Sequence, residues 1–107
     1  MDRLVLDDIL AGIIDMTESD GDRHTYFNPP STVRMRYPAI RYSLNGINPN
    51  YANDGAYRAV PSYSVILIDE DPDTKYLKPI LAIPYCRFNR YYRADNLNHW
   101  EFTIYNN

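Results

Sequence analysis

A continuous apolar run at residues 64–68, which read SVILI, constrains the fold of this chain more than any other stretch. A strand wetted on one face alternates apolar and polar residues, whereas a continuous run is typical of a strand covered on both faces. The run ends in DEDP at residues 69–72, where three carboxylates and a proline end a strand and suit the start of a helix. We therefore expect a central strand over about 57–68 that leads into a helix crossing the sheet.

The length of 107 residues predicts one domain, spanning 1–107, with one hydrophobic core. The single cysteine, Cys86, excludes an internal disulfide framework, and the sequence offers no set of about four ligands at zinc spacing. No stretch approaches the ~20 apolar residues that span a bilayer, and the acidic N-terminus MDRLVLDDIL lacks the basic region of a signal peptide. We expect a soluble, intracellular product with no membrane partner, no cofactor and no metal.

The remaining elements follow from periodicity and from turn-forming residues. Apolar residues at helical spacing predict a helix over 3–16, in which Gly12, about 1 kcal/mol worse than alanine, indicates close packing against another element. A second, short and kinked helix is expected over about 72–83, because Asp71 can cap it, Pro72 suits its first position and Pro79 interrupts it. The predicted strands cover about 32–44, 57–68, 85–94 and 99–105.

The segments between these elements are predicted from their glycine, proline, asparagine and aspartate content. Residues 17–31 and 45–56 are expected to be long loops, and residues 95–98 a tight hairpin turn. Pro38 cannot donate to a ladder, so we expect a bend, a bulge or an edge position there. The order α-β-β-α-β-β predicts an α+β fold, a two-layer sandwich with a four-stranded, mainly antiparallel sheet and helices on one face.

The charges are distributed unevenly, although the formal net charge is only −3. Residues 1–22 are acidic, whereas residues 32–58 are rich in arginine, the residue suited to bidentate ion pairs. The two segments can attract each other between subunits, pair within one subunit, or form two solvated faces. The candidate interface residues are Asp7 and Asp8 on the first helix, Arg34, Arg36 and Arg41 on the first strand, and Tyr51, Asn53 and Asp54 in the protruding loop.

No motif for catalysis or phosphate binding occurs in the sequence, so we expect a protein that is not an enzyme. A small hydrolase that uses Cys86 with His24 or His99 is an alternative, but a buried apolar cysteine is the simpler interpretation. The carboxylates at 69–71 lack the alternating spacing of calcium ligands and are better explained as a helix cap.

A basic and aromatic strand, YCRFNRYYRA at residues 85–94, gives a further alternative, a small nucleic-acid-binding module. Strand alternation places Arg87 and Arg93 on one face with Tyr91, and Arg90 on the other face with Tyr92. This mixture of spacings, without an RNP-like glycine pattern, argues against specific nucleic-acid binding.

Four strings resemble small proteins encoded among the head and neck genes of long-tailed bacteriophages and prophages. They read RMRYPAIRY, ANDGAYRAVPSYSVILIDEDPD, IPYCRF and RADNLNHWEFTIY, and they run from about Arg34 to Tyr105. The order of elements is also similar to that of tail-terminator and tail-completion proteins. The resemblance implies an α+β fold and a virion protein of the neck, made in the cytoplasm of a bacterial host.

The same resemblance implies a function and a set of partners. Such a protein forms a homo-oligomeric ring, expected to be a hexamer, that stops polymerisation of the tail tube and meets the head connector. Its partners would be copies of itself, the tail tube protein and the connector proteins, with DNA passing through the lumen without specific contacts. The chain is short and has no long C-terminal arm, which makes a head–tail adaptor or a head-closure (stopper) protein the nearest alternative.

Overall fold

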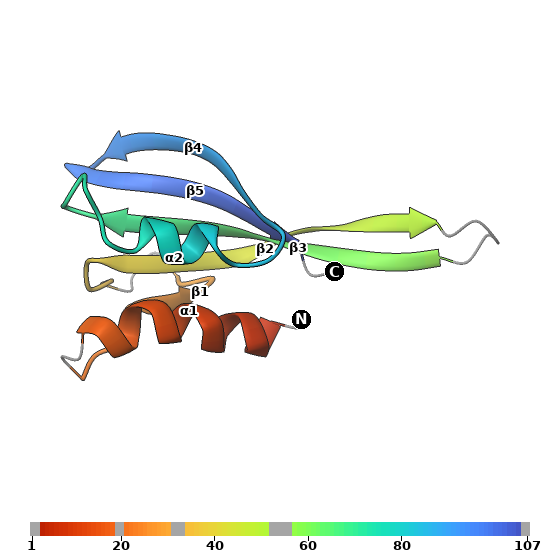
Figure 1. The fold of residues 1–107 in the computed structure, drawn as a ribbon, viewed down its shortest axis with the longest axis horizontal. Helices are drawn as coiled ribbons and strands as arrows, with labels where there is room; N and C mark the ends of the chain where they lie inside the picture. The colour runs from red at the N-terminus through yellow and green to blue at the C-terminus, as the bar shows by residue number, and fades with distance from the viewer. Residues whose placement is uncertain (1–2, 19–20, 31–33, 52–56, 106–107) are drawn as a thin grey trace.

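The computed structural model describes residues 3–18, 21–30, 34–51 and 57–105. These residues form a five-stranded sheet in the order β1-β2-β3-β5-β4, with two helices packed on it (Figure 1). The elements are α1 (Arg3–Glu18), β1 (Thr25–Phe27), β2 (Ala39–Tyr51), β3 (Tyr57–Asp69), α2 (Leu77–Leu81), β4 (Cys86–Ala94) and β5 (Leu97–Tyr105). The predicted α+β class is confirmed.

The predicted four-stranded, mainly antiparallel sheet is only roughly correct, because a fifth strand makes the sheet mixed. β1 pairs in parallel with β2, and it lies inside the segment that was expected to be a loop over 17–31. The Ile40 amide donates to the His24 carbonyl at 2.8 Å, and the Asn28 amide donates to the Tyr42 carbonyl at 2.7 Å. A strand of three residues is too short to show a period in sequence, so alternation could not predict it.

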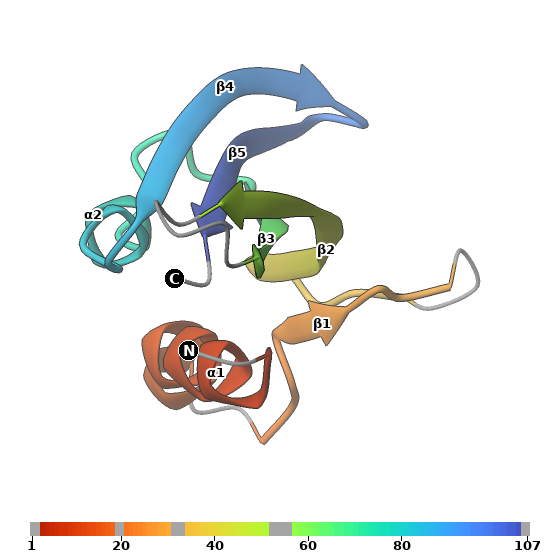
Figure 2. The ribbon, with the colours of Figure 1, turned by 90° about the vertical axis from the view of Figure 1, so that its right-hand side faces the viewer.

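The core lies between the sheet and the two helices, which sit on the same side of the sheet in Figure 2. α1 buries Leu6, Leu10 and Ile14 completely, as its helical spacing predicts. The helix-facing side of the sheet contributes alternate residues of the three central strands, namely Ile40, Tyr42, Tyr63, Val65, Leu67, Trp100, Phe102 and Ile104. The run at residues 64–68 is thus central, as predicted, with β2 on one side and β5 on the other.

The first predicted strand was wrong over residues 34–38, because β2 begins only at Ala39. The backbone before it bonds to side chains instead of a ladder. The Arg36 amide donates to the Tyr26 hydroxyl at 2.8 Å, and His24 Nδ1 donates to the Arg36 and Pro38 carbonyls at 3.0 and 2.8 Å. A cis peptide bond joins Tyr37 to Pro38.

The loop predicted over residues 45–56 was also wrong in large part. β2 continues to Tyr51 and pairs with β3 from Tyr57 onward, with one irregularity between Leu44 and Gly46. The Asn45-Gly46 turn signal therefore marks a bulge inside a strand and not the end of one. This hairpin projects beyond the rest of the sheet and gives the molecule its long axis, 50 Å against 28 and 27 Å (Figure 1).

The second helix is shorter than the predicted span of 72–83 and starts at Leu77. Side chains in the DEDPDT stretch make turns instead of a helix cap: the carboxylate of Asp69 accepts the Asp71 amide at 3.0 Å, and that of Asp71 accepts the Asp73 amide at 2.9 Å. Pro79 does not kink α2, because it lies in the first turn, where a backbone N–H has no intrahelical partner.

The last two strands form the hairpin expected at the C-terminal end of the chain. β4 and β5 are joined by Asp95 and Asn96, which have φ of 53° and 63°. Two successive residues with positive φ are typical of a type I′ turn, for which asparagine and aspartate are suited. Leu97 and Asn98, which were expected in the turn, already belong to β5.

Candidate functional site

The acidic residues of α1 bind other residues of their own chain, although not the arginines of residues 32–58 with which the charge pattern suggested pairing. Asp15 accepts the His24 amide at 2.6 Å, and Glu18 accepts the Tyr76 hydroxyl and lies 3.8 Å from the Lys75 ammonium. These bonds fasten the helix to β1 and to the segment before α2. Most of the acidic side chains of α1 are therefore bound within one subunit.

Asp7, a predicted interface residue, belongs to the same group. Its carboxylate accepts the Tyr42 hydroxyl at 2.5 Å and lies 3.2 Å from the Arg23 guanidinium. The Arg3 guanidinium donates to the Tyr42 hydroxyl oxygen at 3.4 Å. Burial, together with the hydrogen bond to Asp7, raises the pKa of Tyr42 to about 12. Asp8, the neighbouring candidate, is exposed.

The predicted arginines do not lie together on one surface. Arg34 is exposed before β2, and Arg36, also exposed, pairs with Asp22 at 3.1 Å. Arg41 lies on β2 and is half-buried, and its register partners are Tyr26 and Ile66. Adjacent strand residues alternate between faces, so Arg41 lies on the face opposite the helices, between the core residues Ile40 and Tyr42.

The third group of candidates lies in or beyond the projecting hairpin. Tyr51 is the last residue of β2, and its register partner is Tyr57, the first residue of β3. Asn53 and Asp54 lie outside the residues that the structure describes. We call residues 47–51 and 57–61 the arm, because within the described chain β1 pairs with β2 only up to Tyr42 and β5 pairs with β3 only from Ser62 onward.

The arm is amphipathic in its register. The antiparallel pairs Ile47–Pro61, Pro49–Ala59 and Tyr51–Tyr57 alternate with Asn48–Val60 and Asn50–Arg58. The register thus groups mainly apolar and aromatic residue types in the first set of pairs and mainly polar types in the second. In register, residues 57, 59 and 61 of the first set alternate in phase with the core residues Tyr63, Val65 and Leu67.

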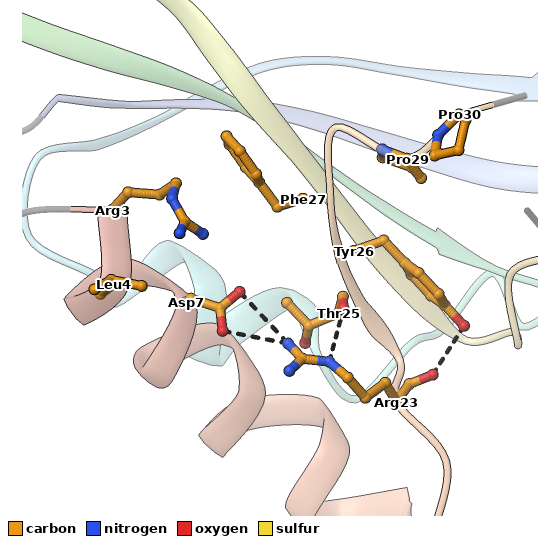
Figure 3. A pocket seen from close by; sticks show the side chains of 9 residues that line it. All are labelled: Arg3, Leu4, Asp7, Arg23, Thr25, Tyr26, Phe27, Pro29 and Pro30. Atoms are coloured by element: carbon orange, nitrogen blue, oxygen red, sulfur yellow. Dashed lines mark hydrogen bonds and ion pairs between the residues drawn. The ribbon is translucent and has the colours of Figure 1, made fainter.

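A cleft of about 510 Å³ lies between the start of α1 and β1 (Figure 3). Its apolar lining consists of Leu4, Tyr26, Phe27, Pro29 and Pro30, and its polar lining of Arg3, Asp7, Arg23 and Thr25. The Arg3 guanidinium sits 4.4 Å from the centre of the Phe27 ring, and Phe27 in turn lies 5.0 Å from Tyr42. Leu4 and Phe27 remain 62% and 42% exposed, although both are large and apolar.

Sequence reasoning missed this cleft for an identifiable reason. Its two walls come from segments about 20 residues apart, and the second wall was expected to be an irregular loop. Leu4 lies outside the buried stripe of α1, which consists of Leu6, Leu10 and Ile14. The only sequence signal for the site was the pair of aromatics at 26–27 followed by two prolines.

The basic strand β4 presents a different combination of residues from the one predicted. A bulge at Asn89 shifts the register, so Arg87, Arg90 and Tyr92 pair with Thr103, Glu101 and His99, whereas Phe88, Tyr91 and Arg93 pair with residues on the other side. The predicted grouping of Arg87 with Tyr91 and Arg93 was therefore wrong. Arg90 lies 3.1 Å from Glu101 and 4.8 Å from the centre of the Tyr92 ring, so it is paired within the chain.

Cys86 does not come together with either histidine. It pairs with Ile104 on the helix-facing side of β4, whereas His99 pairs with Tyr92 on the opposite face and His24 lies beside β1 at the far edge of the sheet. Burial raises the pKa of the Cys86 thiol to about 11, which disfavours the reactive thiolate. The geometry required by the cysteine hydrolase alternative is absent from this arrangement.

The described residues also bear on two other classes of site, a metal centre and a membrane-spanning helix. They contain no group of three or more His, Cys, Asp or Glu that could hold a metal ion. Among the helices in this part of the chain, none has the length and apolar character needed to cross a membrane. Neither a comparison with models of protein families nor one with curated proteins gives a match for this chain.

Proposed function

We propose that this chain is a structural ring subunit of a phage neck, which terminates the tail tube and joins it to the head connector. The resemblance of residues 34–105 to neck and tail-completion proteins supports this proposal. The observation that carries it is the arm, a two-stranded extension of the sheet that reaches beyond the helices and contacts no third strand of the described chain (Figure 1).

An arm of this kind is suited to assembly. An isolated two-stranded hairpin is at best marginally stable in water, so a long one gains stability when another surface covers it. A surface on one copy that meets a different surface on the next copy gives a head-to-tail contact, which closes into a ring when the rotation permits. The arm and the body of the domain are two such different surfaces.

The outer sheet edge formed by β4 favours assembly through the arm over assembly from edge to edge. This nine-residue strand carries three arginines, Arg87, Arg90 and Arg93, and contains the bulge at Asn89. Charged side chains and bulges are devices that prevent an exposed edge from pairing with another chain. We therefore do not expect copies of the domain to pair along this edge.

The test combines oligomeric state with binding to tails. The mass of the purified protein is measured by light scattering after size exclusion, alone and after mixing with purified tail tubes, and bound protein is located by electron microscopy. We expect a ring-sized oligomer at one end of the tube, and tubes assembled without the protein should be uncapped and longer. A strictly monomeric protein that never joins purified tails contradicts the proposal.

The position of the bound protein separates the terminator from its nearest alternatives. A terminator binds the end of the tube in the absence of heads. An adaptor or a head-closure protein binds isolated DNA-filled heads and leaves free tubes unchanged. Incubation of labelled protein with separated heads and tails thus decides between these functions.

A further inference from the structure

The cleft between the start of α1 and β1, which we call the α1–β1 cleft, has the size of a ligand-binding site (Figure 3). Its volume is about 510 Å³, and pockets that bind small ligands usually measure ~300–1,000 Å³. Such pockets combine apolar walls with a few polar groups that fix the orientation of the ligand. The α1–β1 cleft has both kinds of lining, and assembly through the arm does not use them.

Two of the three charged side chains that line the α1–β1 cleft neutralise each other. The Arg23 guanidinium lies 3.5 and 3.2 Å from the two carboxylate oxygens of Asp7. The same carboxylate accepts the hydrogen bond of the Tyr42 hydroxyl. Asp7 therefore has its charge compensated by Arg23 and its position fixed by a second donor.

The third charged side chain, Arg3, has no such compensation in the described chain. Its guanidinium contacts the Tyr42 hydroxyl oxygen at 3.4 Å and lies 4.4 Å from the centre of the Phe27 ring. Tyr42 is neutral at pH 7, because burial raises its pKa to about 12, and Phe27 carries no charge. Two guanidinium groups against one carboxylate leave the cleft lining with a net charge of +1. This excess charge favours an anion as the occupant.

The apolar part of the lining is exposed and preorganised. Leu4 on α1 is 62% exposed and Phe27 at the end of β1 is 42% exposed, although both are large. Pro29 and Pro30 extend this lining, and the proline ring fixes the backbone φ angle. Exposed apolar side chains gathered in a concave surface are typical of binding sites. An occupant with an apolar group would cover them.

The charged groups also favour one class of anion. The planar guanidinium fork matches the two oxygens of a carboxylate, and five N–H donors are available in the group, of which Tyr42 accepts from one. A phosphate monoester carries a second negative charge at neutral pH, which the nearby Asp7 carboxylate disfavours. A monoanion avoids this repulsion. Arg3 also stacks on Phe27, so an aromatic group beside the carboxylate would extend the same stack.

We propose that the α1–β1 cleft binds a monocarboxylate carried by an apolar, preferably aromatic, group. The carboxylate accepts hydrogen bonds from the Arg3 guanidinium, and the apolar group covers Leu4 and Phe27. This chemistry has two natural sources, a free organic acid and the C-terminal residue of a polypeptide. The inference goes beyond the neck function and does not rest on it.

Titration followed by the backbone amide resonances of the intact protein tests this site. Phenylacetate is the probe for a free acid, and N-acetylphenylalanine is the probe for a chain end. Each is compared with its neutral amide, phenylacetamide or N-acetylphenylalaninamide. We expect saturable shifts confined to residues 3–7 and 23–30, and about tenfold weaker binding of each amide, because charge-assisted hydrogen bonds are lost. The acid that binds more tightly identifies the source.

Variants at the two kinds of lining test the assigned contacts. Arg3→Gln should weaken the binding of the tighter acid about tenfold and leave its amide nearly unaffected. Arg87→Gln is the matched control, because Arg87 is also exposed but lies on β4, at the sheet edge opposite β1. Leu4→Ser should weaken the acid and its amide equally. Thermal unfolding verifies that each variant is folded.

Four outcomes overturn the proposal. They are the absence of saturable shifts with either acid, equal binding of an acid and its amide, unchanged binding by Arg3→Gln, and tighter binding of phenyl phosphate than of phenylacetate. None of these measurements involves tails or heads. The ligand site and the neck function can therefore fail independently of each other.

Discussion

The hydroxyl of Tyr42 on β2 donates a 2.5 Å hydrogen bond to the carboxylate of Asp7 on α1, across 35 positions of sequence. This bond joins the helix to the sheet beside the α1–β1 cleft. The guanidinium of Arg23, in the loop before β1, pairs with the same Asp7 carboxylate. The residue that was expected to face a neighbouring subunit therefore helps to form one wall of the cleft. The contribution of the Tyr42–Asp7 hydrogen bond to stability is measurable in two ways.

The Tyr42→Phe variant should lower the free energy of unfolding at neutral pH by about 1–2 kcal/mol, because it removes a hydrogen bond to a charged group while Asp7 retains Arg23. Urea unfolding measures this difference. Tyr37→Phe, at a residue that is 40% exposed, is the control and should change stability by less than about 0.5 kcal/mol. Equal stability of the wild type and Tyr42→Phe would show that the bond contributes nothing.

The wild type and Tyr42→Phe should also differ in how their free energy of unfolding depends on pH. The pKa of Tyr42 is raised from 10.0 to about 12 in the folded chain, so the unfolded chain loses this proton first as the pH rises. The stabilisation is complete below pH 10 and is lost between pH 10 and 12, because the unfolded state binds fewer protons there. Wild type should therefore lose more stability over this range than Tyr42→Phe. The pKa of Tyr76, raised mainly by burial, acts in the same direction in both proteins.

Asn98 should be among the most sensitive polar residues of the domain. Its buried amide donates to the Asp69 and Glu70 carbonyls at 3.2 and 3.1 Å, and its oxygen accepts the Tyr91 hydroxyl. Asn98→Ala should reduce the free energy of unfolding by about 2–3 kcal/mol, because the buried Asp69 carbonyl and the part-buried Glu70 carbonyl lose their donor. Glu70→Gln, which changes only an exposed side chain, should be close to neutral. A neutral Asn98→Ala variant would refute the assigned role.

Two substitutions at Asn96, in the turn between β4 and β5, should change the melting temperature in opposite directions. Asn96 has φ of 63°, a conformation that costs most L-residues ~1–2 kcal/mol and glycine almost nothing. Asn96→Gly should raise the melting temperature slightly, and Asn96→Val should lower it by an amount equivalent to about 1–2 kcal/mol. If both variants melt at the same temperature, the turn does not have the assigned geometry.

Gly12 and Gly21 both have open space around an added Cβ but differ in backbone conformation. Replacing each with alanine should therefore have opposite effects on stability. Gly12 lies in the exposed part of α1, and an added Cβ would meet no atom within 4 Å, so the predicted close packing around it was wrong. Gly12→Ala should stabilise the domain by about 0.5–1 kcal/mol. Gly21 also has open space but a φ of 83°, so Gly21→Ala should be destabilising. Denaturant titration of both variants tests the pair, and a loss of stability in Gly12→Ala would contradict the prediction.

The sequence predicted those features of the fold that depend on long periodic segments. The helical spacing of Leu6, Leu10 and Ile14, and the apolar run at 64–68, placed α1 and β3 correctly. Features that depend on contacts distant in sequence were missed. β1 is held by β2, and residues 34–38 are held out of a strand by the ring of His24.

The candidate site was predicted less well than the fold, for a related reason. Charge patterning drew attention to Asp7 and Arg36, which pair within the chain with Arg23 and Asp22. Turn-forming residues in 45–56 concealed the arm, because an Asn-Gly pair and a proline are also compatible with a bulged, edge-exposed hairpin. The amphipathic character of the arm became visible only with the register, which pairs residues on two different strands.

The chemical reactivity of Cys86 distinguishes a structural protein from the hydrolase alternative. Burial raises the pKa of its thiol to about 11, so at pH 8 only a small fraction is the thiolate that reacts with iodoacetamide. We expect alkylation of the folded protein to be much slower than that of the urea-unfolded protein at pH 8, and to accelerate as the pH approaches 11. A catalytic cysteine activated by a neighbouring histidine would behave in the opposite way, with rapid alkylation near neutral pH. Mass spectrometry of timed samples measures both rates. Rapid labelling of the folded chain at pH 7 would contradict the inert role assigned to this residue and would restore the enzymatic interpretation.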